Sequence, residues 1–145
     1  MSSIVRKLCQ ILGFATLVLS TNTYAQESET TFTQFGGKEG IEKVIAAFIP
    51  IIQADRRIAA NFKDTDMDLL ARQLTTQICQ VTGGPCERHG DDMQTVHRGM
   101  KITELQFNAL AEDLQIAMEQ LGIANSAQNK LIAKLVPMRR DIVGK

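Results

Sequence analysis

Apolar residues recur at three- and four-residue steps along most of this chain, which is the period of an amphipathic helix. Four such stripes are found, over residues 41–52, 67–81, 107–121 and 131–142. Thr103 followed by Gln106 is a capping-box pattern at the start of the third stripe. No long segment alternates with the two-residue period of a strand. The pattern predicts an all-α fold with four long helices, and a short helix over residues 91–98 before the third.

Glycine and proline set the expected boundaries of these helices. Gly40 precedes the first stripe, Gly83-Gly84-Pro85 follows the second and Gly122 closes the third. Pro50 lies inside the first helix and Pro137 inside the last. Because proline removes one backbone hydrogen bond from a helix, we expect a kink at both positions.

The first 25 residues have the pattern of an export signal. Arg6 and Lys7 precede a mainly apolar run over residues 8–19, and Ala25 ends a short stretch suited to signal peptidase. The run is shorter than the roughly 20 residues that cross a bilayer, although an uncleaved anchor is the alternative. We therefore predict a signal peptide over residues 1–25, a flexible polar lead-in over residues 26–31, with polar sequence to Thr33, and one domain over residues 32–145.

Charge and composition exclude several functions. The chain has 16 basic and 16 acidic side chains, and removal of the signal leaves 14 against 16 because Arg6 and Lys7 are lost. This balance does not favour binding to nucleic acid, or to a membrane after signal cleavage. The absence of Trp and the single Tyr argue against aromatic platforms that stack sugars or bases.

Two cysteines remain in the exported chain, Cys79 and Cys86. In an oxidising compartment they can pair as a disulfide, but spacing alone does not show whether their Cα atoms come within reach. A zinc site that adds His89 and His97 is a weaker alternative, since its spacings are loose. The Cys-x-x-Cys-His signature of covalently attached haem is absent.

The chain has only two histidines, His89 and His97. His97 follows a short helical stretch bounded by Gly99, with Met93 one helical turn before it. An imidazole on an apolar helix face suits an axial ligand of haem iron, or a core histidine bonded to a backbone carbonyl. His89 lies in a loop, where we expect it to be exposed unless the loop folds in and makes it a second iron ligand.

From Phe32 to Val143 the sequence resembles the group I truncated haemoglobins, which are small two-over-two globins. Phe35-Gly36-Gly37 and Gly83-Gly84-Pro85 match the two glycine motifs of that family. Residues 93–100, with His97, match the segment that carries the proximal histidine. Residues 102–107 and 135–143 match the last two helices.

This resemblance implies a two-over-two helical sandwich around haem b, with His97 as the only protein ligand to iron. Because the Cys-x-x-Cys-His signature is absent, we expect the haem to be bound non-covalently. It places Phe62 on the haem face and Arg88 and Met93 at the haem edge. It also places three apolar side chains of the second long helix on the distal side of the iron, namely Leu70, Leu74 and Ile78.

The distal side departs from the family pattern. Many relatives have a hydrogen-bonding tyrosine in the first long helix and a glutamine in the second, where this chain has Ile49 and Leu74. Neither can donate a hydrogen bond to a bound gas. We expect rapid oxygen loss, easier oxidation of the iron, and relatively better retention of CO or NO, with Gln73 and Gln77 as nearby substitutes.

Three classes of function follow from these residues. The leading one is reversible binding of oxygen, CO or NO at a His-ligated iron, in a protein exported to the periplasm. The second is an enzyme at the same iron, a nitric oxide dioxygenase or peroxidase-like protein, with a reductase that the sequence does not identify. The third is a helical binding module without a cofactor.

Overall fold

The computed structural model describes residues 30–145, and the predicted signal peptide lies outside these residues. Every regular element between residues 30 and 145 is helical, which confirms the all-α prediction. None of the helices in that range is both long and apolar enough to cross a membrane. The α-helices are α1 (Thr31–Gln34), α2 (Gly37–Ala54), α3 (Met67–Val81), α4 (Met93–Val96), α5 (Glu104–Gln120), α6 (Asn125–Leu135) and α7 (Arg139–Ile142). Two 3-10 helices, η1 (Ala59–Phe62) and η2 (Val136–Met138), complete the fold.

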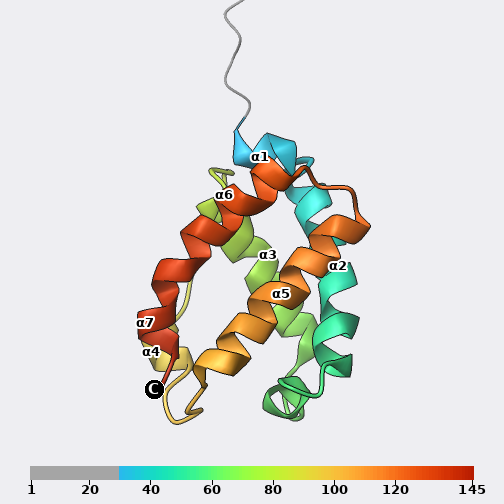
Figure 1. The fold of residues 1–145 in the computed structure, drawn as a ribbon. Coiled ribbons are helices and arrows are strands. Elements are labelled where there is room, and N and C mark those ends of the chain that lie inside the picture. Colours follow the sequence, from blue (N-terminus) through green and yellow to red (C-terminus); the bar gives the residue numbers. More distant parts are fainter. Residues whose placement is uncertain (1–29) are drawn as a thin grey trace, which may run out of the picture.

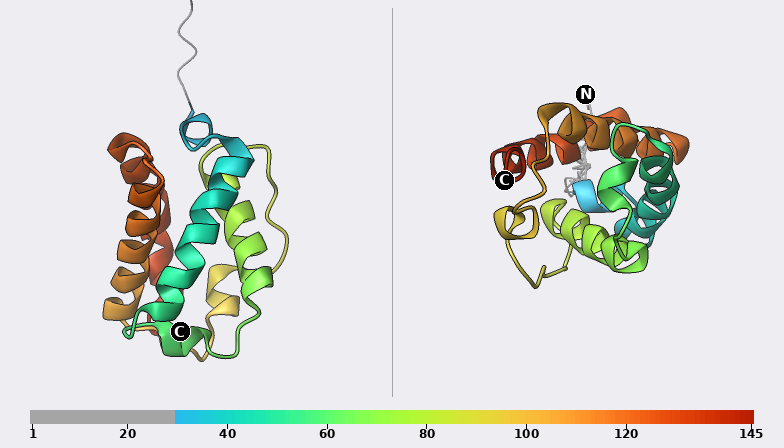
Figure 2. Two further views of the ribbon diagram at one scale, coloured as in Figure 1. Left: turned by 90° about the vertical axis from the view of Figure 1, so that its right-hand side faces the viewer. Right: turned by 90° about the horizontal axis from the view of Figure 1, so that it is seen from below.

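The four long helices form two pairs, with α2 and α3 on one side of the molecule and α5 and α6 on the other (Figures 1 and 2). Helix α2 is central, since it packs on both α3 and α5. Its apolar stripe is fully buried at Ile41, Val44 and Ile52. Burial of such a stripe is the main source of stability for an amphipathic helix. The short helix α4 lies apart from these pairs, near α7.

Side-chain caps and proline set several of the helix ends. Asp66 caps α3, since its side chain accepts a hydrogen bond from the Leu69 N–H at 2.9 Å. Thr103 and Gln106 form the predicted capping box at the start of α5. Pro137 interrupts the last helix, where η2 separates α6 from α7. Helix α2, in contrast, continues through Pro50.

The start of the chain differs from the prediction. Thr31, which the prediction places in the flexible lead-in, belongs to α1, because Thr30 caps this turn and the Phe32 N–H donates to the Thr82 carbonyl at 3.0 Å. Residues 26–29 of the predicted lead-in lie outside the described residues. Helix α2 also begins three residues before Gly40. A Cβ at Gly40 would lie 1.7 Å from the Phe35 carbonyl oxygen, so this glycine permits a close approach of backbone inside the helix.

Cys79 and Cys86 form a disulfide, with their Cα atoms 5.8 Å apart. That separation lies within the usual range for a bridge. The zinc hypothesis is therefore wrong for these residues, because both thiols are used in the bond. Residues 30–145 contain no cluster of three or more His, Cys, Asp or Glu side chains suited to a metal ion.

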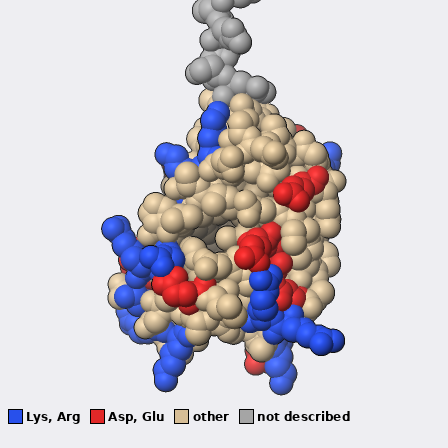
Figure 3. Space-filling model, in the orientation of Figure 1, with Lys and Arg blue, Asp and Glu red and all other residues tan. Residues whose placement is uncertain are grey.

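The face seen in Figure 3 is hollowed between α5 and α6, with α3 behind the opening. Apolar side chains of α5 and α6 line the cavity beneath, including Leu110, Leu114 and Leu135. Val136, in η2, also lines this cavity and is 47% exposed. The two helix pairs therefore do not close completely over the interior on this face.

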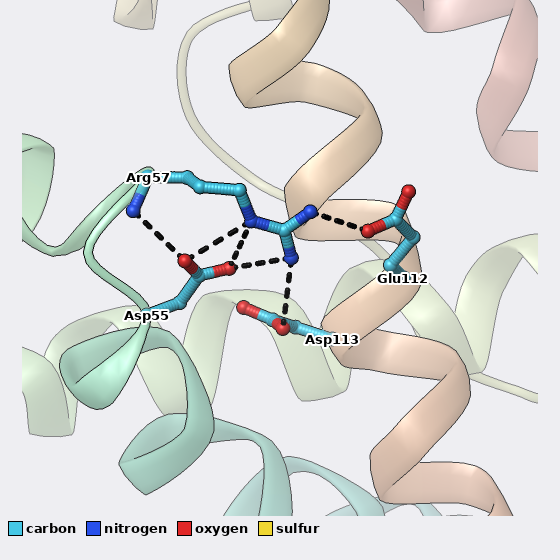
Figure 4. A network of polar contacts seen from close by, with 4 residues as sticks. All are labelled: Asp55, Arg57, Glu112 and Asp113. Atoms are coloured by element: carbon cyan, nitrogen blue, oxygen red, sulfur yellow. Dashed lines mark hydrogen bonds and ion pairs between the residues drawn. The ribbon is translucent and has the colours of Figure 1, made fainter.

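A polar network joins the end of α2 to α5 (Figure 4). The Arg57 Nε donates to Asp55 Oδ2 at 2.9 Å, and its Nη1 pairs with Glu112. Arg57 Nη2 also lies 3.9 Å from Oδ1 of Asp113, whose other oxygen is buried without a hydrogen-bond partner. Hydrogen bonds from Arg57 lower the pKa of Asp55. Burial, followed by the nearby charge of Asp55, raises the pKa of Asp113.

Replacement of Asp113 by Asn is expected to change the pH dependence of stability. Because folding raises the pKa of Asp113, its contribution to stability is complete below its usual pKa of about 4 and is lost as the pH rises through the folded value. An asparagine has no such titration. The thermal midpoint of Asp113→Asn should therefore rise relative to wild type as the pH increases above about 4.

The matched control is Glu112→Gln, which removes an exposed carboxylate from the same Arg57. Thermal midpoints of the three proteins, measured over a series of pH values, check this account. A constant difference between the thermal midpoints of Asp113→Asn and wild type at all pH values would show that folding does not change the pKa of Asp113.

Candidate functional site

Helix α4 is a single turn that positions His97. Asp92 caps its start, with its carboxylate accepting from the Thr95 N–H at 2.7 Å. This hydrogen bond lowers the pKa of Asp92, so the cap persists as a carboxylate well into the acid range. At the other end, the backbone N–H of His97 donates to the Met93 carbonyl at 3.2 Å. His97 is thus fixed at the C-cap of a turn that is held at both ends.

The imidazole of His97 has a defined orientation. Its Nδ1 lies 2.7 Å from the backbone carbonyl oxygen of Met93. A carbonyl only accepts, so Nδ1 must carry the proton, and in the neutral ring Nε2 keeps its lone pair. A backbone acceptor on Nδ1 is the arrangement that usually orients metal-binding histidines.

His97 lies where three neighbouring cavities meet, and Leu110 also borders all three. The cavity between α3 and α4 has a volume of about 480 Å³, within the roughly 300–1,000 Å³ typical of sites for small molecules and cofactors. Its apolar walls are formed by Phe48, Ile52, Phe62, Leu69, Leu70, Leu74, Met93, Val96, Met100 and Leu110. The inner cavity, of about 130 Å³, is the one that lies beneath the opening in Figure 3, and it continues from the larger cavity toward α5 and α6.

Several apolar side chains at the mouth of the larger cavity face solvent. Leu69 and Val96 are each 47% exposed and Met100 is 44% exposed, and all three line this cavity. Val96 and Met100 flank His97 in sequence, whereas Leu69 comes from the facing wall on α3. Exposed apolar side chains gathered around one opening are typical of a ligand-binding groove.

The segment between α3 and α4 contributes polar groups to the same cavity. Arg88, His89 and Asp91 all line it. The Arg88 guanidinium donates to the Asp91 carbonyl and His89 is exposed, as the sequence predicts. The cavity therefore has apolar walls and, in this segment, a cationic group suited to pair with a carboxylate.

The structure brings most of the predicted site residues together. Phe62, Leu70, Leu74, Arg88, Met93 and His97 line the larger cavity, and Ile78 lines the inner one. Ile49 lines neither of these cavities and packs on the edge of the core. Helix α2 instead contributes Phe48 and Ile52, one position before and three after Ile49.

Several residues that line the cavity were not predicted from the sequence. Phe48 and Ile52 belong to the buried stripe of α2, and nothing in that stripe distinguishes cavity wall from core. Val96 and Met100 carried a usable signal, because apolar residues flank His97 in a polar segment. Gln73 and Gln77 both line the larger cavity. The Gln77 Nε2 lies 3.2 Å from the sulfur of Met138 and 3.9 Å from that of Met93.

Comparison with known proteins identifies the family. Residues 30–143 match the family described as Bacterial-like globin. The group 1 truncated haemoglobin of Tetrahymena pyriformis is 30% identical over 117 residues, which span 81% of this chain and 97% of that protein. The chain belongs to the bacterial-like globins, among the group 1 truncated haemoglobins. The corresponding protein of Tetrahymena thermophila is 27% identical over 83% of this globin and 99% of its own length.

Solved structures agree with this assignment. The ferric truncated haemoglobin of T. pyriformis has a TM-score of 0.77 to this globin, with 30% identity over 80% of this chain and 99% of that one. The 2/2 haemoglobin of Synechococcus sp., solved in the cyanomet state with covalently attached haem, has a TM-score of 0.74 at 21% identity, over 79% of this chain and 98% of that one. The two-over-two helical fold is therefore confirmed.

Membership of this family implies a haem cofactor and haem-based binding of gases in general. The residues of this globin fit such a group, because the walls of the cavity are apolar and His97 can coordinate iron through Nε2 while its Nδ1 is already hydrogen-bonded. Arg88 supplies a cation at the same cavity for a propionate carboxylate. A cofactor-free binding module is the less favoured class of function for a member of this family.

Proposed function

We propose that this globin binds haem b non-covalently through Nε2 of His97 and reversibly binds diatomic gases on the opposite face. The hydrogen bond between His97 Nδ1 and the Met93 carbonyl is the observation that carries the proposal, because it leaves the lone pair of Nε2 free to coordinate iron. The iron of a bound haem supplies the open coordination position at which such gases bind. Phe62, Leu70 and Leu74 enclose the group in apolar surface and exclude water.

The test is reconstitution of the exported form with haem. One haem should bind per chain, and the ferrous protein should shift its absorption on addition of CO. Extraction into acidified organic solvent should remove all the haem, since Cys79 and Cys86 are joined to each other and no Cys-x-x-Cys-His signature is present. A protein that stays folded and colourless would contradict the proposal.

The distal wall favours weak retention of oxygen. Leu70 and Leu74 line the cavity from α3, and neither carries a hydrogen-bond donor. The amide of Gln77 is turned toward two methionine sulfurs, and Gln73 is exposed. Bound oxygen carries partial negative charge, so the lack of a donor is expected to speed its release and to favour oxidation of the iron. CO and NO, which depend less on such a donor, are expected to be retained better.

Nitric oxide dioxygenation is the second candidate, and we expect it to be inefficient. The reaction needs oxygen to remain bound until nitric oxide arrives. Rapid mixing of the oxygenated protein with nitric oxide should give slow or incomplete conversion to the ferric form and nitrate. A Leu74→Gln variant, which places a donor on the distal wall, should convert a larger fraction. Fast and complete conversion by the wild type would favour the enzymatic function, supported by a reductase.

We also propose that the protein acts in the periplasm after removal of residues 1–25. The disulfide between Cys79 and Cys86 supports this location, because such bonds persist in oxidising compartments. Mass spectrometry of the protein from the periplasmic fraction should give a chain that begins at Gln26. A chain that retains Met1 and stays in the cytoplasm would contradict this proposal.

A further inference from the structure

Residues 85–91, the segment that connects α3 to α4, form few hydrogen bonds. Residues 85–91 take part in no backbone–backbone hydrogen bond. The hydrogen bond from Arg88 to the Asp91 carbonyl stays within the segment, so it does not anchor the segment to the rest of the fold. A surface segment without such anchors is expected to open at low free-energy cost.

This segment nevertheless forms part of the haem cavity. Arg88, His89 and Asp91 line the cavity together with His97. The segment leads directly into Asp92, the cap of the helical turn that carries His97. Any displacement of residues 86–91 therefore affects both the polar groups at the cavity and the approach to its ligand-bearing turn.

The disulfide is the anchor that the segment otherwise lacks. Cys79 is completely buried in the last turn of α3, whereas Cys86 is partly exposed at the start of the segment. Packing around the bond is tight, since a Cβ at Gly84 would lie 2.5 Å from the Phe32 ring and 2.7 Å from the Cys79 sulfur. The bond thus links the segment to α3, the helix whose Leu70 and Leu74 form the facing wall.

We propose that the Cys79–Cys86 disulfide is a redox-sensitive tether that sets how firmly the protein retains haem. A dithiol reductant opens it by thiol–disulfide exchange, beginning with attack on the sulfur of Cys86, which is the more exposed of the two residues. The sulfur–sulfur bond breaks and each cysteine gains one electron and one proton, while the dithiol loses two of each and forms its own disulfide. With the tether open, residues 86–91 move away from the cavity and haem leaves faster. This inference rests on the proposed haem binding.

Transfer of ferric haem to an excess of an apoglobin acceptor measures retention directly. We expect roughly tenfold faster loss from wild type in the presence of a dithiol, at the low end of effects seen when groups that position a metal ligand are removed. A Cys79→Ala/Cys86→Ala variant should lose haem at the fast rate with or without the dithiol. That variant also controls for direct effects of the dithiol on haem. Glu87→Gln, an exposed neighbour of the bond, should behave as wild type.

Trypsin cleavage after Arg88 gives a second measurement that needs no comparison of variants. In the haem-loaded wild type, reduction should expose this bond to cleavage while the helical circular dichroism signal is retained. Equal rates of haem loss and of cleavage in the oxidised and reduced proteins would contradict the proposal that the disulfide acts as a tether. Failure of every form to bind haem would instead contradict the proposed function, so the two failures are distinguishable.

Discussion

Replacement of His97 by Ala is expected to abolish stable haem binding. His97 is the residue that places a neutral nitrogen, with its lone pair free, at the junction of the three cavities. Loss of groups that merely orient a metal ligand already costs about 10- to 100-fold in affinity, so loss of the ligand itself should exceed roughly 100-fold. The absorption of the haem-loaded protein and the rate of haem transfer to an acceptor measure this effect.

The matched control is His89→Ala, the other histidine that lines the same cavity. We expect it to keep haem with a wild-type spectrum, because His89 lies in the exposed segment and not on α4. Added imidazole should partly restore the spectrum of His97→Ala by filling the space of the lost ring. If His97→Ala keeps haem as tightly as wild type while His89→Ala releases it, the ligand has been assigned to the wrong residue.

Replacement of Leu74 by Gln is expected to slow the release of oxygen by about 5- to 150-fold. A hydrogen bond to a group that is otherwise unpaired in an apolar cavity contributes on the order of 1–3 kcal/mol, which corresponds to that range of rates. Leu74 lines both the larger and the inner cavity from α3, so a longer polar side chain there can reach the face at which we propose that gases bind. Oxygen dissociation after rapid mixing with excess CO is the measurement.

Leu74→Met is the control for this change, because it keeps an apolar side chain of similar volume without a donor. It should leave oxygen release close to wild type, and CO release should change little in both variants. If the wild type already releases oxygen slowly, or Leu74→Gln has no effect, a donor such as Gln73 or Gln77 must already serve the distal face.

Most of the fold can be predicted from the sequence, because the helix caps and the period of the buried apolar residues indicate the same helices. The period of the apolar stripe locates α2, and caps at Asp66 and Thr103 fix the starts of α3 and α5. Helix α1 was missed since a four-residue turn has no period to detect. Its stability depends on the contact of Phe32 with Thr82 and Gly84, residues 50 or more positions away in the chain.

The site could be predicted less completely. His97 stands out in the sequence because the chain has only two histidines. The exposure of the apolar residues that flank it, Val96 and Met100, is explained only by the folded protein, in which they line the cavity. Helical period could not separate Ile49 from Phe48 and Ile52, because all three lie on one face of α2 and a small rotation decides which of them line the cavity. The sequence alone does not show whether Cys79 pairs with Cys86, because the pairing depends on the distance between their Cα atoms.

The most direct test of the central claim is resonance Raman spectroscopy of the ferrous protein without added gas. Coordination of the iron by His97 predicts an iron–histidine stretching band that is present in wild type and in His89→Ala and is lost in His97→Ala. A band that persists without His97, or a wild-type ferrous protein that shows none, would contradict coordination through His97 Nε2.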